Sequence, residues 1–168
     1  MMRNKMRVPG RKSDDEPGDA HFLTFSCYHR LPFLEPEKHK QIFIENLGRS
    51  RDRLGFLLYA YVVMPEHVHL LLWPGEGGAT IAQILQSVKQ PVSARLRYRI
   101  GMPPAYWQAG GGHDRNVWSS KTVLSIIEYI HNNPVERGLS RTPLDYPWSS
   151  AAWYEDRTGP LVVDPWCP

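Results

Sequence analysis

The strongest constraint on the fold is a pair of almost wholly apolar segments separated by only two residues, Pro65 and Glu66. Residues 56–64 and 67–73 are rich in leucine, valine and aromatic side chains, and each has the length of a β-strand. A connection this short joins neighbouring antiparallel strands, so the two segments should form a hairpin. The first strand is too apolar to be an exposed edge of a sheet.

Strand and helix patterns alternate around this hairpin. Aromatic and β-forming residues predict a strand over residues 21–28. Apolar residues at helical spacing predict a helix over residues 37–53 that ends at Gly55. A second helix should begin near Thr80, and Pro91 should kink or divide it.

The second half of the chain is expected to complete the sheet and to add one helix. A fourth strand should open at residues 106–108, before glycines 110–112 interrupt it. A third helix over residues 120–133 should stop at Pro134, and the proline-rich remainder should form an irregular strap on the core. The order strand, helix, strand, strand, helix, strand predicts an α+β ferredoxin-like sandwich, an antiparallel sheet with helices on one face plus the added C-terminal helix.

The length of 168 residues suits one compact domain. We expect a flexible basic segment over residues 1–20, the folded domain over residues 21–155 and an irregular tail over residues 156–168. No apolar run approaches the roughly 20 residues that cross a bilayer. Cys27 and Cys167 lack a nearby partner cysteine, which is typical of reduced thiols in a cytoplasmic protein.

The charge distribution permits nucleic-acid binding without requiring it. The net charge is +3 and the pI is about 8.9, which is a mildly basic balance. Basic residues gather at the N-terminus, at positions 49–53 and at positions 89–99, and these clusters are either solvated surface or a surface that follows phosphates. The candidate DNA contacts are Lys89, Arg95, Arg99 and Arg115.

A histidine pair lies on the second strand of the hairpin. Side chains alternate along a strand, so His67 and His69 project from one face and Val68 from the other. Their Cα atoms lie about 7 Å apart, so both rings can bind one divalent cation, with a third ligand from elsewhere. The pattern alone is more often a surface or packing feature, but two histidines inside an apolar hairpin require hydrogen bonds or a metal.

The third helix carries a tyrosine and an asparagine four residues apart, Tyr129 and Asn133. At about 100° per residue they lie about 40° from each other, whereas His131 lies about 160° from Tyr129. A site that uses Tyr129 would therefore hardly use His131, and the neutral amide oxygen of Asn133 is the better third metal ligand. Tyr129 could equally pack with a hydrated hydroxyl, and Asn133 could simply end the helix before Pro134.

Four segments in the right order give the chain a family resemblance. Residues 61–72 are similar to the HUH segment (histidine, hydrophobic residue, histidine) of the REP-associated tyrosine transposases, and residues 129–138 are similar to that family's nucleophile helix. Residues 107–108 and 146–150 also fit the family pattern. The resemblance covers roughly residues 15–155.

The resemblance implies a site and a reaction. His67, His69 and Asn133 would bind magnesium or manganese, and Tyr129 would be the nucleophile. The family's substrate is single-stranded DNA that carries short palindromic hairpins. Tyr129 would cut it to leave a 5′-phosphotyrosine link and a free 3′-hydroxyl, and the reverse step would join new ends. The resemblance leaves open whether the protein is a monomer or a homodimer.

The chain departs from the family at Glu66, where members often have asparagine, and across residues 110–115. Loop polarity is the favoured interpretation of His113 and Asp114, which are therefore left out of the site. Two other functions stay open. One is a metal-dependent hydrolase that uses the histidine pair, with or without His113, and the other is a domesticated DNA-binding module that has lost its chemistry.

Overall fold

The computed structural model describes residues 19–101, 103–110 and 112–166. Most of the expected N-terminal segment, residues 1–18, and Cys167 lie outside the described residues. The strands are β1 (Ala20–Ser26), β2 (Leu57–Val63), β3 (His67–Trp73) and β4 (His113–Val117). The helices are α1 (Glu37–Leu54), α2 (Ile81–Leu96), α3 (Ser120–Glu136) and α4 (Ala151–Asp156), with short 3-10 turns η1 (Tyr28–Arg30), η2 (Arg97–Ile100) and η3 (Pro143–Asp145).

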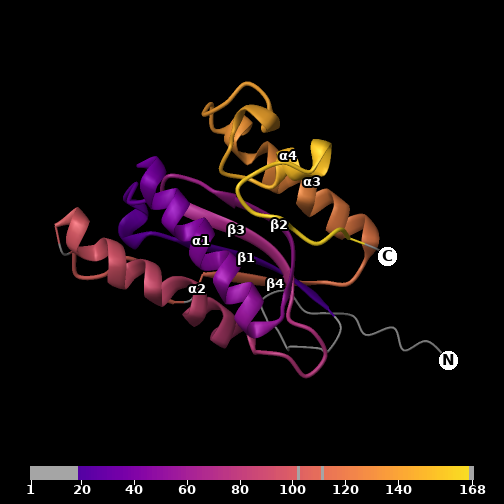
Figure 1. Cartoon of the computed structure of the whole chain (residues 1–168), viewed down its shortest axis with the longest axis horizontal. Helices are drawn as coiled ribbons and strands as arrows, with labels where there is room; N and C mark the ends of the chain where they lie inside the picture. Colours follow the sequence, from indigo (N-terminus) through magenta and orange to yellow (C-terminus); the bar gives the residue numbers. More distant parts are fainter. Residues whose placement is uncertain (1–18, 102, 111, 167–168) are drawn as a thin grey trace.

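The sheet has the ferredoxin-like order β2-β3-β1-β4, with every neighbouring pair antiparallel. Helices α1 and α2 pack against each other, whereas α3 packs against β2 and β3. Figure 1 shows α1 and α2 next to each other, with α3 and α4 grouped apart from them. The predicted α+β sandwich with an added C-terminal helix is confirmed.

The two faces of the sheet bury two separate cores, because side chains alternate along each strand. Leu23, Phe25 and Val68 belong to the core under α1 and α2. Ala60 and Leu71 belong to the core under α3. Among the described residues, no helix combines the length and the apolar character needed to cross a bilayer.

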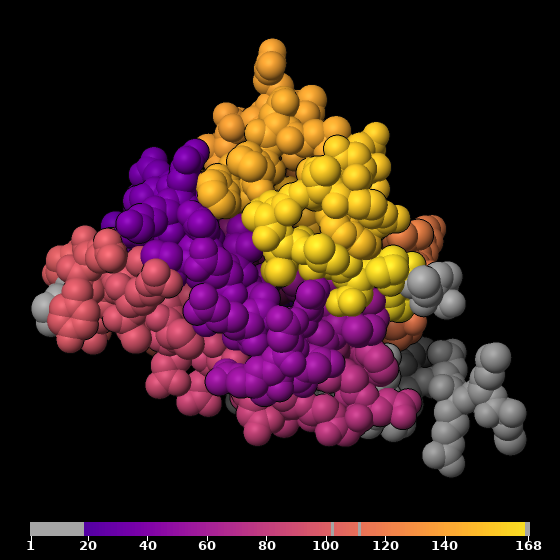
Figure 2. Space-filling view, in the orientation of Figure 1, coloured from indigo at the N-terminus to yellow at the C-terminus, as the bar shows by residue number. Residues whose placement is uncertain are grey.

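The apolar hairpin is formed as predicted, but β2 lies at one end of the sheet rather than inside it. Its outer edge is covered by the C-terminal part of the chain. The Val63 amide donates to the Trp148 carbonyl, the Ser150 amide to the Tyr61 carbonyl, and the Asp164 amide to the Leu58 carbonyl. Figure 2 shows this C-terminal segment lying against the α1 region of the surface. The predicted strap therefore protects a strand edge, and it contains the short helix α4.

The fourth strand was predicted too early in the chain. Trp107 forms only an isolated bridge with Cys27, and the strand itself is β4, which begins after the glycines. Trp107 packs instead in the core, where its indole Nε1 donates to the Lys89 carbonyl at 2.9 Å. Gly112 is required at the start of β4, because a Cβ there would lie 2.1 Å from the Thr24 carbonyl oxygen.

Contrary to the prediction, Pro91 does not divide its helix and Pro134 does not end its helix. Helix α2 continues through Pro91, which leaves the Ser87 carbonyl without its usual amide donor. The side chains of Asn46 and Ser50 donate to that carbonyl from α1 at 3.2 and 3.1 Å. Helix α3 likewise continues through Pro134 to Glu136, so it extends about one turn beyond its predicted end.

Candidate functional site

The two histidines of β3 meet at their Nε2 atoms. His69 lies opposite Thr24 and His67 opposite Ser26 in the antiparallel pairing with β1, on the face that α3 covers. Both side chains are buried, with 4% of each residue exposed. Their Nε2 atoms are 3.1 Å apart. When two nitrogen ligands bind one cation at right angles, each about 2.1 Å from it, the two nitrogen atoms are about 3 Å apart.

An oxygen atom holds the far side of each imidazole ring. His67 Nδ1 lies 2.9 Å from Glu66 Oε1, and His69 Nδ1 lies 2.7 Å from Thr24 Oγ1. A carboxylate only accepts, so His67 donates from Nδ1 to Glu66. When His69 takes the same tautomer and donates to the threonine hydroxyl, both Nε2 lone pairs face each other. Two facing lone pairs repel unless a cation or a proton lies between them, so the pair fits a metal.

Burial keeps the imidazoles in the neutral form that binds metals. Burial lowers the pKa of His69 to about 3, and the neighbouring His67 adds to this effect. The pKa of His67 is also lowered by burial, although Glu66 opposes the shift. Burial alone would raise the pKa of the Glu66 carboxyl, but His67 and Arg137 hold it below its ordinary value. At neutral pH the group is therefore two neutral rings beside one carboxylate.

Helix α3 places Tyr129 against this pair. The Tyr129 ring lies edge-on to the imidazole of His69, with centroids 5.4 Å apart, and edge-on to the ring of Phe22 at 6.0 Å. Tyr129 is 42% exposed, so the residue is partly open to solvent. It thus combines ring contacts to His69 and Phe22 with an exposed side-chain surface.

Asn133 lies one helical turn beyond Tyr129 and is buried, with 6% exposed. One turn further along the same helix, Arg137 Nη1 contacts Glu66 Oε1 at 2.9 Å, so Asn133 lies on the edge of α3 that faces the histidines. Its Oδ1 atom has no hydrogen-bond partner among the described residues. An orphan amide oxygen of this kind costs about 1–3 kcal/mol in a protein interior, and a metal ion would satisfy it.

The chemistry of the donor set also favours an amide as the third ligand. Among the described residues, no three histidine, cysteine, aspartate or glutamate side chains converge as a metal site. A third ligand of a metal bound here would therefore be of another type, and Asn133 offers a neutral oxygen of the kind that suits magnesium or manganese. The structure brings His67, His69, Asn133 and Tyr129 to one face, as the sequence predicts.

His131 lies on the other side of α3, as its helical angle predicts. Its Nε2 atom is 2.9 Å from Ser150 Oγ, and its ring packs on that of Tyr154. Burial lowers its pKa to about 4. This histidine is therefore a packing residue that fixes the C-terminal strap to the helix.

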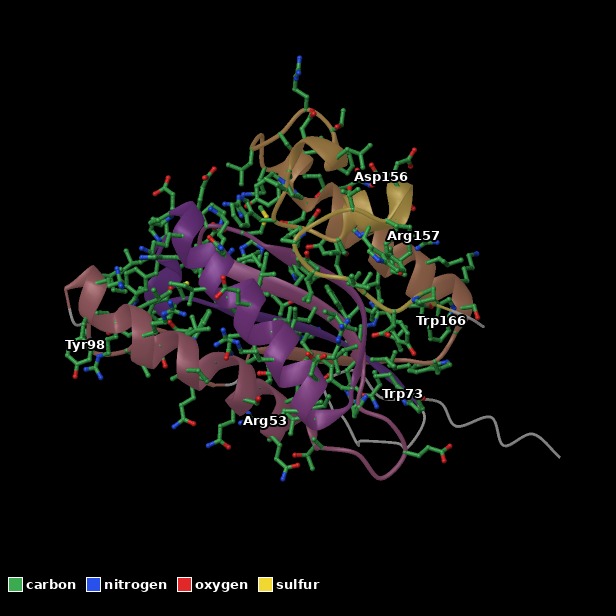
Figure 3. The ribbon with its side chains drawn as sticks, viewed as in Figure 1. Arg53, Trp73, Tyr98, Asp156, Arg157 and Trp166 are labelled. Atoms are coloured by element: carbon green, nitrogen blue, oxygen red, sulfur yellow. The ribbon has the colours of Figure 1, made fainter. Side chains whose placement is uncertain are left out.

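The four candidate DNA contacts do not gather in one place. Lys89 is half-buried and lies over the Phe25 and Trp107 rings of the core on the α1 and α2 side. Arg95 and Arg99 are exposed at the end of α2 and in η2, which Tyr98 marks in Figure 3. Arg115 differs from these three.

Arg115 is exposed on β4 and lies directly opposite Phe22, on the face that carries Tyr129. His113 is exposed on the same face, opposite Thr24. Asp114 lies on the other face, 2.9 Å from His21 Nδ1, so its role is a strand contact. The predicted polar loop is thus an edge strand with a basic side toward the site.

Sequence reasoning missed three side chains around the histidines. Thr24 and Phe22 come from β1, and only the strand register places them beside His69. Arg30 contacts Glu66 at 3.4 Å from the η1 turn. Thr24 and His69 are 45 residues apart, so their pairing leaves no signal in the local sequence. Glu66 is visible in the sequence next to His67, but its hydrogen bond to that ring is not.

Comparison with known proteins finds a protein of similar sequence. No protein-family model matches the chain. A REP-associated tyrosine transposase of Escherichia coli (strain K12) is 23% identical over 133 residues, which cover 79% of this chain and 76% of the relative. The chain is similar to the REP-associated tyrosine transposases. The resemblance inferred from the sequence motifs is confirmed.

The fold is also that of a REP-associated tyrosine transposase. A solved structure of one such transposase, bound to a REP hairpin, superimposes with a TM-score of 0.70 at 20% identity. The match covers 99% of this chain and 100% of that transposase. At this identity the likeness shows the fold, and the chemistry has to be argued from the side chains of this chain.

Proposed function

We propose that this protein is a REP-associated tyrosine transposase that cuts and rejoins single-stranded DNA bearing palindromic hairpins. The observation that carries the proposal is the placement of the exposed Tyr129 against His69, whose Nε2 faces that of His67. The similarity to a named transposase supports the same function. Because the substrate would be DNA, the protein would act in the cytoplasm.

His67, His69 and Asn133 would hold a magnesium or manganese ion. The 3.1 Å separation of the imidazole nitrogens and the orphan Asn133 amide oxygen support this set. Such an ion supplies charge neutralisation at a non-bridging phosphate oxygen. Glu66 and Thr24 would keep both rings in the ligand orientation, because their oxygen atoms lie within hydrogen-bond distance of the Nδ1 atoms.

Tyr129 would be the nucleophile. Its hydroxyl oxygen would form a bond to phosphorus while the bond from phosphorus to the 3′ oxygen breaks. The phenol loses its proton and the departing 3′ oxygen gains one. The products are a 5′-phosphotyrosine link and a free 3′-hydroxyl.

Rejoining would be the same exchange in reverse. A 3′-hydroxyl from another strand would attack the phosphotyrosine and release Tyr129. One phosphodiester bond is exchanged for another in each step, so no nucleotide triphosphate is required. Phe22 would hold the tyrosine ring at the site between the two steps, since it contacts both Tyr129 and His69.

Cleavage of a labelled single-stranded hairpin tests the proposal. Wild-type protein with manganese should cut the DNA, and Tyr129→Phe should not, because the variant keeps the ring packing and loses the attacking oxygen. Cleavage that continues in Tyr129→Phe would favour the metal-dependent hydrolase. Hairpin binding without any cleavage by the wild-type protein would favour the DNA-binding module.

A further inference from the structure

Two arginines converge on Glu66 beside the histidine pair. Glu66 Oε1 lies 2.9 Å from Arg137 Nη1 and 3.4 Å from Arg30 Nη2, and the same atom accepts from His67. One carboxylate charge therefore faces two guanidinium charges, and a positive charge remains. The carboxylate side chain is only 10% exposed, whereas the arginine side chains are 60% (Arg30) and 50% (Arg137) exposed.

The backbone that carries Arg30 is held in an uncommon conformation. His29 and Arg30 both have left-handed φ angles, of 50° and 54°. Such a conformation is uncommon and unfavourable in a residue other than glycine, so the surrounding contacts must hold it. The Arg30 amide donates to the Cys27 carbonyl at 2.9 Å, and the His29 amide donates to Gln108 Oε1 at 3.0 Å. These bonds fix the turn that brings the Arg30 guanidinium to Glu66.

We propose that Arg30 and Arg137 bind a backbone phosphate of the DNA next to the phosphate at the histidine pair. The inference rests on the proposed function. A guanidinium has five donors in a planar fork that matches phosphate oxygens, and among the described residues each of these two contacts only one carboxylate oxygen. The remaining donors are available at the exposed rim. Glu66 would preorganise both groups and position them relative to His67.

The place of this pair distinguishes it from the basic residues expected from the sequence. Lys89 belongs to the layer on the other face of the sheet, whereas Arg137 is the C-cap residue of α3. Arg30, in η1, and Arg137 are more than 100 residues apart in sequence. A strand that reaches Tyr129 would therefore meet these two guanidinium groups before the clusters on α2.

A structural role is the alternative to phosphate binding. In that case the arginines would only tie η1 and α3 to Glu66, and their loss would lower stability without changing how binding depends on salt. The salt dependence separates the two roles. A phosphate contact releases counterions from DNA, so its loss reduces the slope of log affinity against log salt by about 1.

The test measures fluorescence anisotropy of a labelled hairpin with a single-stranded extension, in EDTA so that binding is observed without cleavage. The variants are Arg30→Gln, Arg137→Gln and both together, since glutamine keeps a donor toward Glu66. Arg141→Gln is the matched control, because Arg141 is 96% exposed and has a single long contact to Asp145. We expect the slope to fall by about 1 in the double variant, which loses the one phosphate contact, and by no more than that in each single variant, with no change in the control.

Unchanged slopes in the site variants would overturn the inference, and so would an equal fall in Arg141→Gln. A weaker affinity for hairpin and scrambled DNA to the same degree is expected, because phosphate contacts carry no sequence information. The failure of the proposed function has a different signature. Wild-type protein that forms no covalent product with manganese overturns the proposed function, whatever the slopes are.

Discussion

The ring of Tyr129 lies edge-on against the imidazole of His69, with ring centroids 5.4 Å apart. Tyr129 on α3 and His69 on β3 are 60 residues apart in sequence, and this contact places a ring that bears a hydroxyl next to an imidazole. Phe22 closes the contact from β1. Tyr129 therefore does not require a large rearrangement to reach the histidine pair.

Loss of either histidine should abolish metal binding. His67→Ala or His69→Ala removes one of two nitrogen ligands, so manganese affinity measured by calorimetry should fall below detection. His113→Ala is the control, because His113 is exposed on the same face of the sheet. A large loss in His113→Ala would instead support the hydrolase, in which that residue is a further ligand.

Replacement of Asn133 should have opposite effects on the stability of the metal-free protein and on metal binding. Asn133→Leu removes a buried oxygen that has no partner among the described residues, so the metal-free protein should gain about 1 kcal/mol in free energy of unfolding. Manganese at a hundredfold excess over its Kd should stabilise the wild type by about 2.7 kcal/mol, and the variant should lose this gain. Urea unfolding with and without manganese measures both effects.

Asn132→Ala provides the control for Asn133→Leu. Its side chain bonds to the Glu128 carbonyl within the helix, so the metal-induced gain should persist. Retention of that gain in Asn133→Leu would exclude Asn133 as a ligand.

Glu66 and Thr24 should tune the metal affinity without being ligands. Glu66→Gln and Thr24→Val each change the acceptor at one Nδ1 atom and preserve the side-chain shape. Loss of such a partner typically weakens metal binding about 10- to 100-fold, and we expect this range for each variant by calorimetry. An affinity equal to that of the wild type in both variants would show that the ring orientations do not depend on these oxygens.

The C-terminal strap should contribute to stability through Ser150. Its hydroxyl lies 2.9 Å from His131 Nε2 and accepts from the Tyr61 amide at 3.0 Å. Ser150→Ala leaves two buried polar groups without this partner, so the free energy of unfolding should fall by about 2 kcal/mol or more. Urea denaturation measures the loss. A fall of less than about 0.5 kcal/mol would mean that other groups or water satisfy both atoms.

Local periodicity was enough to predict the side chains that face the site. The alternation of β3 places His67 and His69 on one face, and the helical angle separates His131 from Tyr129 and Asn133, as the structure shows. These relations depend only on the repeat of one strand or one helix. They therefore leave a signal within a few residues of sequence.

The errors and omissions arise from contacts between distant segments. Pro91 looks like a helix breaker until Asn46 and Ser50 on α1 supply donors to the carbonyl that it leaves free. The aromatic residue Trp107 looks like part of a strand, yet its ring fills the core, and the polar segment after the glycines pairs with β1. Arg30 reaches the site through a left-handed turn that no local pattern predicts.

The most direct test of the account is the mass of the protein after incubation with single-stranded hairpin DNA and manganese under denaturing conditions. The account predicts a covalent adduct whose nucleotide remnant maps by tandem mass spectrometry to Tyr129. The adduct should disappear in Tyr129→Phe and persist in Tyr98→Phe, since Tyr98 is 71% exposed and belongs to η2. Cleaved DNA with no protein adduct, or an adduct on another residue, would contradict the account.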